Sequence, residues 1–428
     1  MHVNLPFGGG TIHVDIPDNW LNGRCYRPRR FESAGDEHAE VLHAVDNLIG
    51  GSKDFPALLA GRSSVAIAID SAYPSLFNEL IPVFLECIED HSNLRPDQIT
   101  LVLSNTLWNP KQDYDVRLMV PSEITNRYNL VLHDPKDKKA VVRLGETDVI
   151  LNRAFAEADL KIVVSCIVPH MIYGFTGPGT VLTPGLTYEK VTKRLHGYES
   201  VSHPLAVRGC VDGNPFTAQG KLALEAADVS LAVCCPVTPE GRVSEVYAGE
   251  PEAAWMEAVG RMRELMAITV KEPMDIVVAA SGGLPHDSTM LKLIDALCAV
   301  EPVLKPDGTI VMVAELSMGF GPTPLREMLL GAGGLKGFCE RFESGGTFLP
   351  GQWVAQRFFE LLSRHEVILY SQGIEEDALW TMGMTPTNDM QEAILGAMQE
   401  HGQRCKICAL PDGPFGLARI QTAAASNA

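Results

Sequence analysis

Two histidines and an aspartate are the residues of this sequence whose types and positions suit acid–base chemistry or metal binding. His170 follows an apolar run that ends near Ile167, and imidazole titrates near neutral pH, so His170 is a candidate general acid or base, although an isolated histidine is more often structural. Asp70 ends another apolar run, where a carboxylate can orient a ligand or, equally well, cap a helix expected from about Ser75. His196 alone fits either a surface histidine or a metal ligand. Because the sequence has no HExxH motif and no second CxxC motif, a metal would arrive within a cofactor.

The glycine-rich segment 169–180, which includes His170, follows the apolar run that ends near Ile167. Its glycines permit close approach of the backbone to a ligand, and its amides and hydroxyls could hold a phosphate. It matches neither a Walker loop nor a dinucleotide fingerprint, so the sequence is only a weak indication of phosphate binding.

The elements that position these residues are expected to be buried strands alternating with helices. Short runs rich in Val, Ile and Leu, typical of strands buried on both faces, lie at 64–70, 98–103, 160–167, 275–280, 309–314 and 366–370. Helix-like stretches between them lie at 37–48, 76–89, 188–195, 289–300 and 353–363. This alternation predicts an α/β protein with two domains, each built on a mostly parallel sheet with flanking helices. Ligands in such folds bind where strands end, which is where Asp70 and His170 lie.

The chain of 428 residues exceeds the usual size of one hydrophobic core, and the βα pattern restarts near Met274 after a helix expected at 253–271. We therefore expect an N-terminal α/β domain at 1–270, with the cofactor loop and the metal histidine, and a C-terminal α/β domain at 271–405. A C-terminal segment follows at 406–428, and its small, polar end at 422–428 is expected to be disordered. Residues 305–308, Lys-Pro-Asp-Gly, are expected to form a turn before a strand.

Composition and charge limit the classes of molecule that this protein is expected to bind. The formal net charge of −18 disfavours binding to nucleic acid or to an anionic membrane, which leaves a small molecule in a focused pocket. No run reaches the roughly 18 to 20 apolar residues that span a bilayer, and the first residues lack an apolar signal core, so a cytoplasmic location is expected. The ten cysteines show no regular framework and are expected to be reduced, with the lone Cys405-x-x-Cys408 structural or incidental.

Segments spread over essentially the whole chain resemble, in order and spacing, the nickel-pincer lactate racemases. They are Leu5-Pro6-Phe7-Gly8 with Ile16-Pro17-Asp18, Asp70-x-x-x-Pro74, Pro169-His170-x-x-x-Gly174-x-x-Gly177, Pro184-Gly185, His196, Asp212-Gly213-Asn214-Pro215, Gly282-Gly283-x-Pro285-x-Asp287 and Gln352-Trp353-x-x-Gln356.

The resemblance implies a nickel-pincer nucleotide, which is a pyridinium mononucleotide that holds nickel through two sulfurs and a ring carbon. His196 matches the protein ligand to nickel, and Trp353 matches an aromatic residue near the cofactor. The segment around the nucleotide phosphate matches Gly174, Thr176, Gly177, Gly179 and Thr180.

The activity implied by the resemblance is inversion of a 2-hydroxy acid by reversible hydride transfer, with His170 matching one of two histidine bases. The implied partners are a small 2-hydroxy acid and the proteins that make and load the cofactor. No nucleic-acid or membrane partner is implied.

Several positions depart from the lactate-specific pattern. Tyr73 replaces an arginine that clamps the substrate carboxylate, and a phenol cannot replace a charged fork. Leu107 replaces the second base. Thr180 replaces the lysine that tethers the cofactor, so the cofactor is expected to bind noncovalently. Lys292 and Asp295 match a glutamine and a lysine, and Lys292 is either a replacement cation or a solvated lysine.

The hypothesis is therefore a nickel-pincer racemase or epimerase of a hydroxy acid other than lactate. Asp70, His170, His196 and Trp353 are placed in the site, with Tyr73 as a possible second acid–base group. Leu107, Trp108 and Tyr73 would suit a bulkier substrate. An enzyme that stops at the oxidised carbonyl stays open. The alternative is a noncatalytic paralogue that binds a nucleotide or a small acid.

Overall fold

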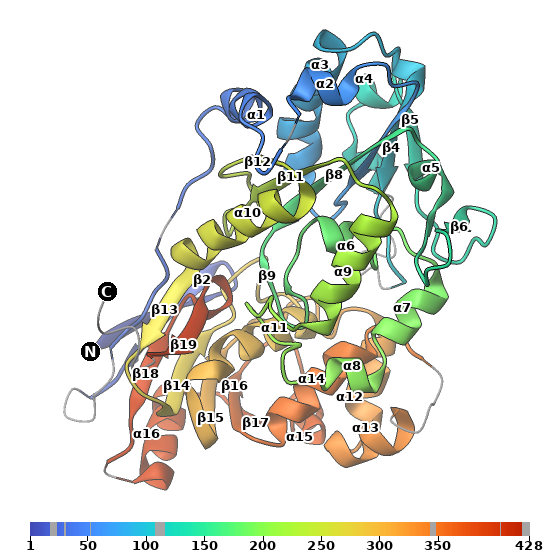
Figure 1. Cartoon of the computed structure of the whole chain (residues 1–428). Helices are drawn as coiled ribbons and strands as arrows, with labels where there is room; N and C mark the ends of the chain where they lie inside the picture. Colours follow the sequence, from blue (N-terminus) through green and yellow to red (C-terminus); the bar gives the residue numbers. More distant parts are fainter. Residues whose placement is uncertain are drawn as a thin grey trace. The chain divides into compact units, whose positions relative to one another are not determined.

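The computed structural model describes residues 1–17, 24–29, 31–51, 53–107, 116–342, 348–402 and 404–421, and these form two compact units (Figure 1). Unit 1 contains Met1–Arg29, Gly197–Ser202 and Leu265–Ala428, and unit 2 contains Arg30–His196 and His203–Glu264. The expected domain boundaries at 270 and 405 stay predictions. The disorder expected at 422–428 lies outside the described residues.

Unit 2 is built on a six-stranded sheet with the strand order β12-β11-β8-β3-β4-β5. Every neighbouring pair is parallel except β11 and β12, which are antiparallel. The strands of this sheet are β3 (Val65–Ile69), β4 (Ile99–Leu103), β5 (Asn129–Leu132), β8 (Leu160–Ile167), β11 (Leu231–Pro236) and β12 (Tyr247–Gly249). Two short hairpins accompany the sheet: β6 (Val141–Arg143) with β7 (Ile150–Asn152), and β9 (Pro169–His170) with β10 (Gly174–Phe175).

Helices cover both faces of this sheet, which is why its strands read as continuous apolar runs. On β3, Ile67 and Ile69 face one hydrophobic cluster, and the smaller Ala66 and Ala68 face another. The first cluster lies under α1 (Glu37–Asp46), α2 (Phe55–Leu59), η2 (Leu76–Leu80) and α3 (Ile81–Asp90). The second lies under α5 (Arg153–Ala156), α6 (Pro178–Leu182) and α9 (Pro215–Ala226). The remaining helices are η3 (Pro96–Gln98), η4 (Val116–Met119), α4 (Ser122–Thr125), α7 (Glu189–Leu195) and α10 (Pro251–Met266), whose last two residues belong to unit 1.

Unit 1 is built on a five-stranded parallel sheet with the order β17-β16-β15-β14-β18. Its strands are β14 (Met274–Ala280), β15 (Leu304–Val313), β16 (Glu366–Tyr370), β17 (Thr385–Thr387) and β18 (Ile407–Leu410). The pairs β1 (His2–Phe7) with β2 (Gly10–Asp15) and β13 (Ala267–Val270) with β19 (Leu417–Ile420) complete its strands. Its helices are α8 (Tyr198–Val201), α11 (Met290–Val300), η5 (Glu301–Val303), α12 (Thr323–Gly331), α13 (Gly334–Phe342), α14 (Gln352–Leu362), α15 (Glu376–Met382), α16 (Met390–His401) and η6 (Gly413–Phe415).

The predicted α/β class with mostly parallel sheets is confirmed, and all six expected buried strands are present. No described helix is long and apolar enough to cross a membrane.

Two local expectations are wrong. The helix expected at 253–271 ends at Met266, because the β-branched residues that follow form β13, which pairs with β19. The turn expected at 305–308 lies inside β15 as an irregularity, with Asp307 at a φ of 60°. The helix expected at 76–89 is confirmed as a continuous helical stretch: η2, a π-helical turn, leads directly into α3, whose second residue is Pro82.

Replacement of Leu101 by alanine should lower the free energy of unfolding by about 2–5 kcal/mol, because its side chain is fully buried in the centre of β4. The matched control is Leu118→Ala in the same unit, where the side chain is 75% exposed and the expected change is under about 0.5 kcal/mol. Urea denaturation measures both. Equal destabilisation by the two variants would contradict the assignment of β4 to the core.

Candidate active site

The loops that leave β3 and β4 are joined at the carboxyl edge of the unit 2 sheet. The Ser71 hydroxyl donates to the carbonyl of Ser104 at 2.5 Å, and the Ser71 amide donates to the Ser104 hydroxyl at 3.1 Å. The Asp70 carboxylate accepts from the amide of Ala72 at 3.0 Å, so it closes a turn in its own loop, whereas η2 has Ser75 as its N-cap. This edge is where ligands bind in parallel α/β folds.

Tyr73 and Leu107 are both half-buried at this edge. Tyr73 packs against the hydrophobic cluster on the α1–α3 face, beside Gly241. Leu107 lies in the loop after β4. Trp108, which the sequence placed next to them, lies outside the described residues. The aromatic ring at 73 is thus partly engaged in packing, and residue 107 offers no proton.

His170 ends β9, and its ring nitrogen Nδ1 accepts from two backbone amides, those of Ile172 at 3.2 Å and Tyr173 at 3.3 Å. Because Nδ1 is an acceptor, the proton of the neutral ring lies on Nε2. The loop turns back at Gly174, where φ is 73° and an added Cβ would lie 1.9 Å from the carbonyl oxygen of Cys210. Only glycine fits there, so the backbone fixes the position of the imidazole.

His196 is the C-cap residue of α7, and its side chain is only 4% exposed. Its Nδ1–H donates to the carbonyl of Thr192 at 2.9 Å, which leaves the lone pair on Nε2. Burial lowers the pKa of His196 to about 4, and the bond to Thr192 opposes this only in part. A neutral imidazole whose second nitrogen is oriented by a carbonyl is the usual arrangement of a metal-binding histidine.

Tyr173 lies between the two histidines, and the sequence reasoning missed it. Its hydroxyl contacts His196 Nε2 at 3.0 Å, and its ring meets His170 edge-on at 4.9 Å and Phe216 at 4.7 Å. Burial raises the pKa of Tyr173 well above its usual value, so the phenol keeps its proton and donates to His196. The signal that could have identified it was a tyrosine three residues after His170 within the glycine-rich segment.

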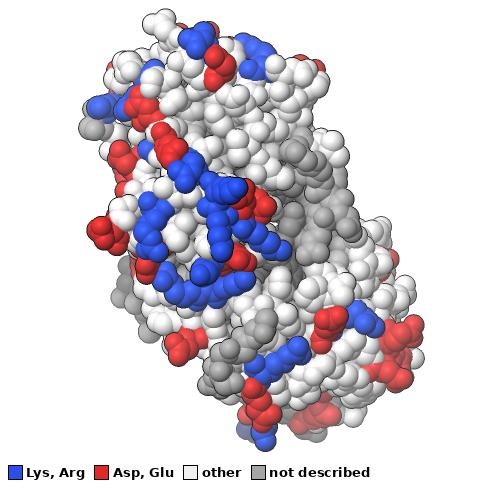
Figure 2. Space-filling model, turned by 90° about the vertical axis from the view of Figure 1, so that its right-hand side faces the viewer, with Lys and Arg blue, Asp and Glu red and all other residues white. Residues whose placement is uncertain are grey.

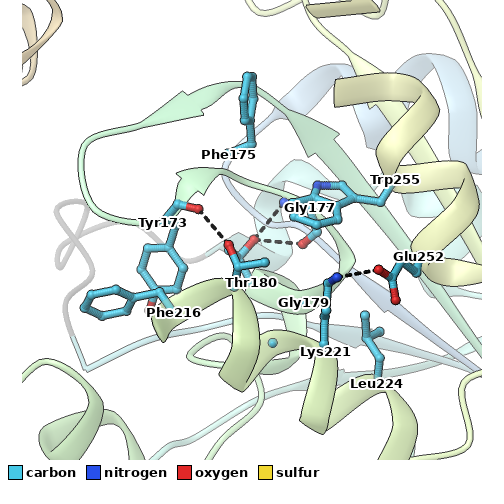
Figure 3. Close-up of a pocket in the computed structure, with 12 residues that line it drawn as sticks. Tyr173, Phe175, Gly177, Gly179, Thr180, Phe216, Lys221, Leu224, Glu252 and Trp255 are labelled. Atoms are coloured by element: carbon cyan, nitrogen blue, oxygen red, sulfur yellow. Dashed lines mark hydrogen bonds and ion pairs between the residues drawn. The ribbon is translucent and has the colours of Figure 1, made fainter. Parts of the chain in front are cut away.

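A pocket lies beside this cluster, within unit 2 (Figure 3). Its lining includes four aromatic side chains: Tyr173, Phe175, Phe216 and Trp255. Glycines let the walls approach closely, since an added Cβ at Gly177 would lie 2.3 Å from the Trp255 ring nitrogen. Lys221 and Glu252 form an ion pair at the pocket.

The two threonines of the candidate cofactor loop use their hydroxyls to bind backbone groups of the loop itself and of the residues just before it. Thr180 accepts from the amide of Gly177 at 2.9 Å and donates to its carbonyl at 2.8 Å. Thr176 donates to the carbonyl of Cys166 at 2.8 Å and accepts from the amide of Val168 at 2.9 Å. The hydroxyls therefore stabilise the loop around Gly177 and Gly179, which both line the pocket.

The remaining candidates lie in unit 1. Trp353 is half-buried in the first turn of α14, Lys292 is exposed in the first turn of α11, and Asp295 is half-buried one turn later. Thr289 caps α11, accepting from the amide of Lys292. These three positions stay predictions as site residues.

On the face in Figure 2, Lys and Arg side chains gather with carboxylates among them. Around β6 and α7, side chains of opposite charge form ion pairs. Asp148 pairs with Arg143 at 3.2 Å and with Arg194 at 2.8 Å, and Glu189 pairs with Lys193 at 2.7 Å. Much of the positive charge of these segments is therefore neutralised within the protein.

The described residues contain no group of three or more His, Cys, Asp or Glu side chains that could hold a metal ion. His196 offers one imidazole nitrogen, Nε2, as a possible metal ligand.

Residues 7–208 match the family described as the lactate racemase N-terminal domain, and residues 269–415 match the lactate racemase C-terminal domain. The lactate racemase of Lactiplantibacillus plantarum is 25% identical over 419 residues, which cover 96% of this chain and 98% of the relative. That of Thermoanaerobacterium thermosaccharolyticum is 23% identical over 420 residues, with the same coverage. The structure of the lactate racemase apoprotein from the latter organism matches with a TM-score of 0.87, covering 98% of this chain and 100% of that chain at 23% identity. A Thermotoga maritima protein shares the fold more distantly, with a TM-score of 0.60 at 14% identity over 85% of this chain and 95% of that chain.

The free energy of unfolding of the metal-free protein should fall as the pH drops from about 6.5 to 4. In this window the unfolded chain binds a proton at His196 that the folded chain, whose pKa is lowered to about 4, does not bind. His196→Gln should reduce this fall. His133, also buried with a lowered pKa, stays in both proteins, so the difference isolates His196. Urea denaturation at pH 7 and pH 5 measures it, and an unchanged pH dependence in the variant would contradict the buried neutral imidazole.

Proposed function

Because the chain belongs to the lactate racemase family, we propose that it is an isomerase that inverts the carbon bearing the hydroxyl group of a 2-hydroxy acid with a nickel-pincer nucleotide. The observation that carries the proposal is the buried His196, whose Nε2 lone pair is available to a metal when the Tyr173 hydroxyl moves aside. Imidazole is a suitable ligand for nickel.

The pocket beside His196 supports the nucleotide part of the proposal. Its aromatic lining suits a flat, positively charged ring, because aromatic faces attract cations and stack on other rings. Lys221 would be the cation nearest to a phosphate at this pocket once it parts from Glu252, and their ion pair, about 35% and 49% exposed, is of a kind that costs little to break.

The threonine at position 180 is consistent with noncovalent binding of the cofactor. Thr180 has no amine with which to form a thioamide-type link, and its hydroxyl is engaged with the backbone of Gly177. Residues Gly174, Thr176, Gly177 and Gly179 would then hold the cofactor through the shape of the loop. In unit 1, Trp353 and Lys292 are the candidates for further cofactor contacts.

When bound, the cofactor would supply reversible acceptance of a hydride, and side chains of the protein would donate and accept the protons. His170 presents Nε2–H, which can donate to a substrate oxygen. To accept the hydroxyl proton, its ring must release Nδ1 from the amides of Ile172 and Tyr173, whose bonds of 3.2 and 3.3 Å are long and therefore weak. Asp70 would order the neighbouring loop. Tyr73 is the candidate for the second acid–base group.

The substrate is proposed to be larger than lactate. Tyr73 lacks the permanent charge that would pair with a carboxylate, a contact worth about 1.5–3 kcal/mol, or roughly ten- to hundredfold in binding. Leu107, in place of an acid–base residue, adds apolar surface instead. A bulky or aromatic 2-hydroxy acid can recover through buried surface the free energy that a small acid cannot.

A noncatalytic binding protein is the second candidate. It is favoured by Leu107, which can exchange no proton, and by the hydrogen bonding of His170, whose neutral ring points an N–H rather than a lone pair away from the loop. Such a protein would keep the pocket and His196 without turnover.

His196→Ala should abolish nickel binding in protein produced together with cofactor-making enzymes, because it removes the proposed protein ligand. The matched control is His91→Ala. His91 is also the C-cap of a helix, α3, and its Nδ1 also contacts the carbonyl four residues earlier, at 2.9 Å. Elemental analysis should find nickel in the parent and in the control and none in His196→Ala. Stoichiometric nickel in His196→Ala would show that the ligand assignment is wrong.

The loaded protein should invert the hydroxyl-bearing carbon of a bulky or aromatic 2-hydroxy acid faster than that of lactate. Tyr73→Arg should raise inversion of lactate by roughly ten- to hundredfold, because it restores a charged partner for the carboxylate. Chiral chromatography of a series of single-enantiomer acids of increasing size measures both effects. Inversion of lactate faster than that of every larger acid would refute the substrate proposal, and no inversion of any acid would favour the binding protein.

A further inference from the structure

The chain leaves unit 2 directly after His196 and returns to it at His203. The six residues between them, Gly197–Ser202, belong to unit 1 and are called the strap below. The strap contains the short helix α8, which packs against α14 of unit 1. The proposed nickel ligand is therefore the last residue before a segment whose packing lies in the other unit.

Gln356 of α14 is the main anchor of the strap. Its side chain is fully buried, and its Nε2 lies 3.0 Å from the carbonyl oxygen of Tyr198 and 2.7 Å from the hydroxyl of Ser202. The Ser202 hydroxyl also donates to the carboxylate of Glu360 at 3.0 Å, and Glu360 lies 3.0 Å from Gln356 Nε2. One amide group thus contacts both ends of α8 and the carboxylate beside them.

Other contacts reinforce this anchor. The Tyr198 hydroxyl lies 3.1 Å from the sulfur of Cys339 on α13, and Val201 is fully buried. Arg357 donates to Glu360 at 2.9 Å, and both side chains are largely buried, which holds that carboxylate in place. The strap is therefore fixed at its first turn and at its end.

On the other side, His196 is fixed within unit 2. Its backbone amide donates to the carbonyl of Thr192 at 3.0 Å, its ring Nδ1 donates to the same carbonyl, and its ring Nε2 accepts from Tyr173. Only Gly197 separates this residue from the first anchored residue of the strap, Tyr198. Because a single residue joins them, a displacement of Tyr198 is transmitted almost directly to the backbone of His196.

We propose that Gln356 is a positioning residue for His196 and acts through the strap, an inference that rests on the proposed role of His196 as the nickel ligand. The hydrogen bonds from Gln356 to the Tyr198 carbonyl and the Ser202 hydroxyl hold the strap in place, and the strap in turn constrains the backbone at His196, the C-cap of α7. Gln356 lies on α14 three residues after Trp353, the candidate for a cofactor contact. A metal-binding imidazole needs such support, because small displacements of a ligand lower metal affinity.

Gln356→Met tests the proposal in the metal-free protein, because methionine keeps the length and volume of glutamine but donates no hydrogen bond. The amides of Val201 and Ser202, which donate to Gly197 and Tyr198, should exchange with solvent about tenfold faster. The Nδ1–H of His196 should also exchange faster, whereas the ring N–H of His133, which contacts Thr187 at 3.1 Å elsewhere in unit 2, should not change. NMR of selectively labelled histidines and backbone amides reads out all of these groups.

The matched control is Gln391→Met, which removes two hydrogen bonds of similar length to Asp15 within unit 1 but far along the chain from the strap. It should leave both histidines unchanged. Ser202→Ala, at an exposed position, should act in the same direction as Gln356→Met and covers the case in which the latter fails to fold. Faster exchange in the strap without any change at His196, or no change in the strap, would overturn the proposal. Because no metal is present, either result leaves the nickel assignment to its own test.

Discussion

The hydrogen bond from His196 Nδ1 to the carbonyl of Thr192 is the interaction on which the proposed chemistry depends. It fixes the tautomer of a buried ring, and burial keeps that ring neutral, so one lone pair points away from the helix. Tyr173 keeps its proton for the same reason and supplies the donor that this lone pair needs in the absence of a metal. The apolar surroundings thus keep the His196 ring neutral, while its hydrogen bonds to Thr192 and Tyr173 orient it.

The surrounding backbone makes this arrangement possible through close contacts that only glycine permits. Gly174 lies against the carbonyl of Cys210, and Gly177 lies against Trp255, whose indole N–H donates to the carbonyl of Thr176 at 2.9 Å. Gly179 and Gly220 bring α6 and α9 within van der Waals contact. The same glycines that shape the pocket wall therefore position His170 and Tyr173 relative to α7, and the loop gains its rigidity without using charged groups.

Much of the fold could be predicted from the sequence, because strands buried on both faces, such as β8, leave an unbroken apolar run. The helix predicted through 271 was wrong because Ala267–Val270 pairs with β19, some 150 residues away along the chain, and local patterns contain no information about that partner. Among the candidate site residues, His170 and His196 were proposed from residue type and resemblance and stay predictions, whereas Tyr173, which contacts both of them, was not singled out.

The sequence did not single out three pocket-lining residues, Tyr173, Phe216 and Trp255. All three are large aromatic residues, which a sequence pattern does not distinguish from residues of the hydrophobic core. Their role depends on which side of the ring faces the pocket, and that is set by contacts between distant segments. The tautomers of the two histidines also could not be predicted, because they follow from the placement of single carbonyls and amides, such as those of Thr192 and Ile172.

The protonation of the His196 ring is the most direct test of this account. Long-range proton–nitrogen NMR correlations on the metal-free, histidine-labelled protein at pH 7 distinguish the protonated from the unprotonated ring nitrogen. The account predicts a neutral ring with the proton on Nδ1 and an unprotonated Nε2 that accepts from Tyr173, and it predicts that Tyr173→Phe changes the Nε2 shift while Nδ1 stays protonated. A proton on Nε2, or a doubly protonated ring at this pH, would contradict it.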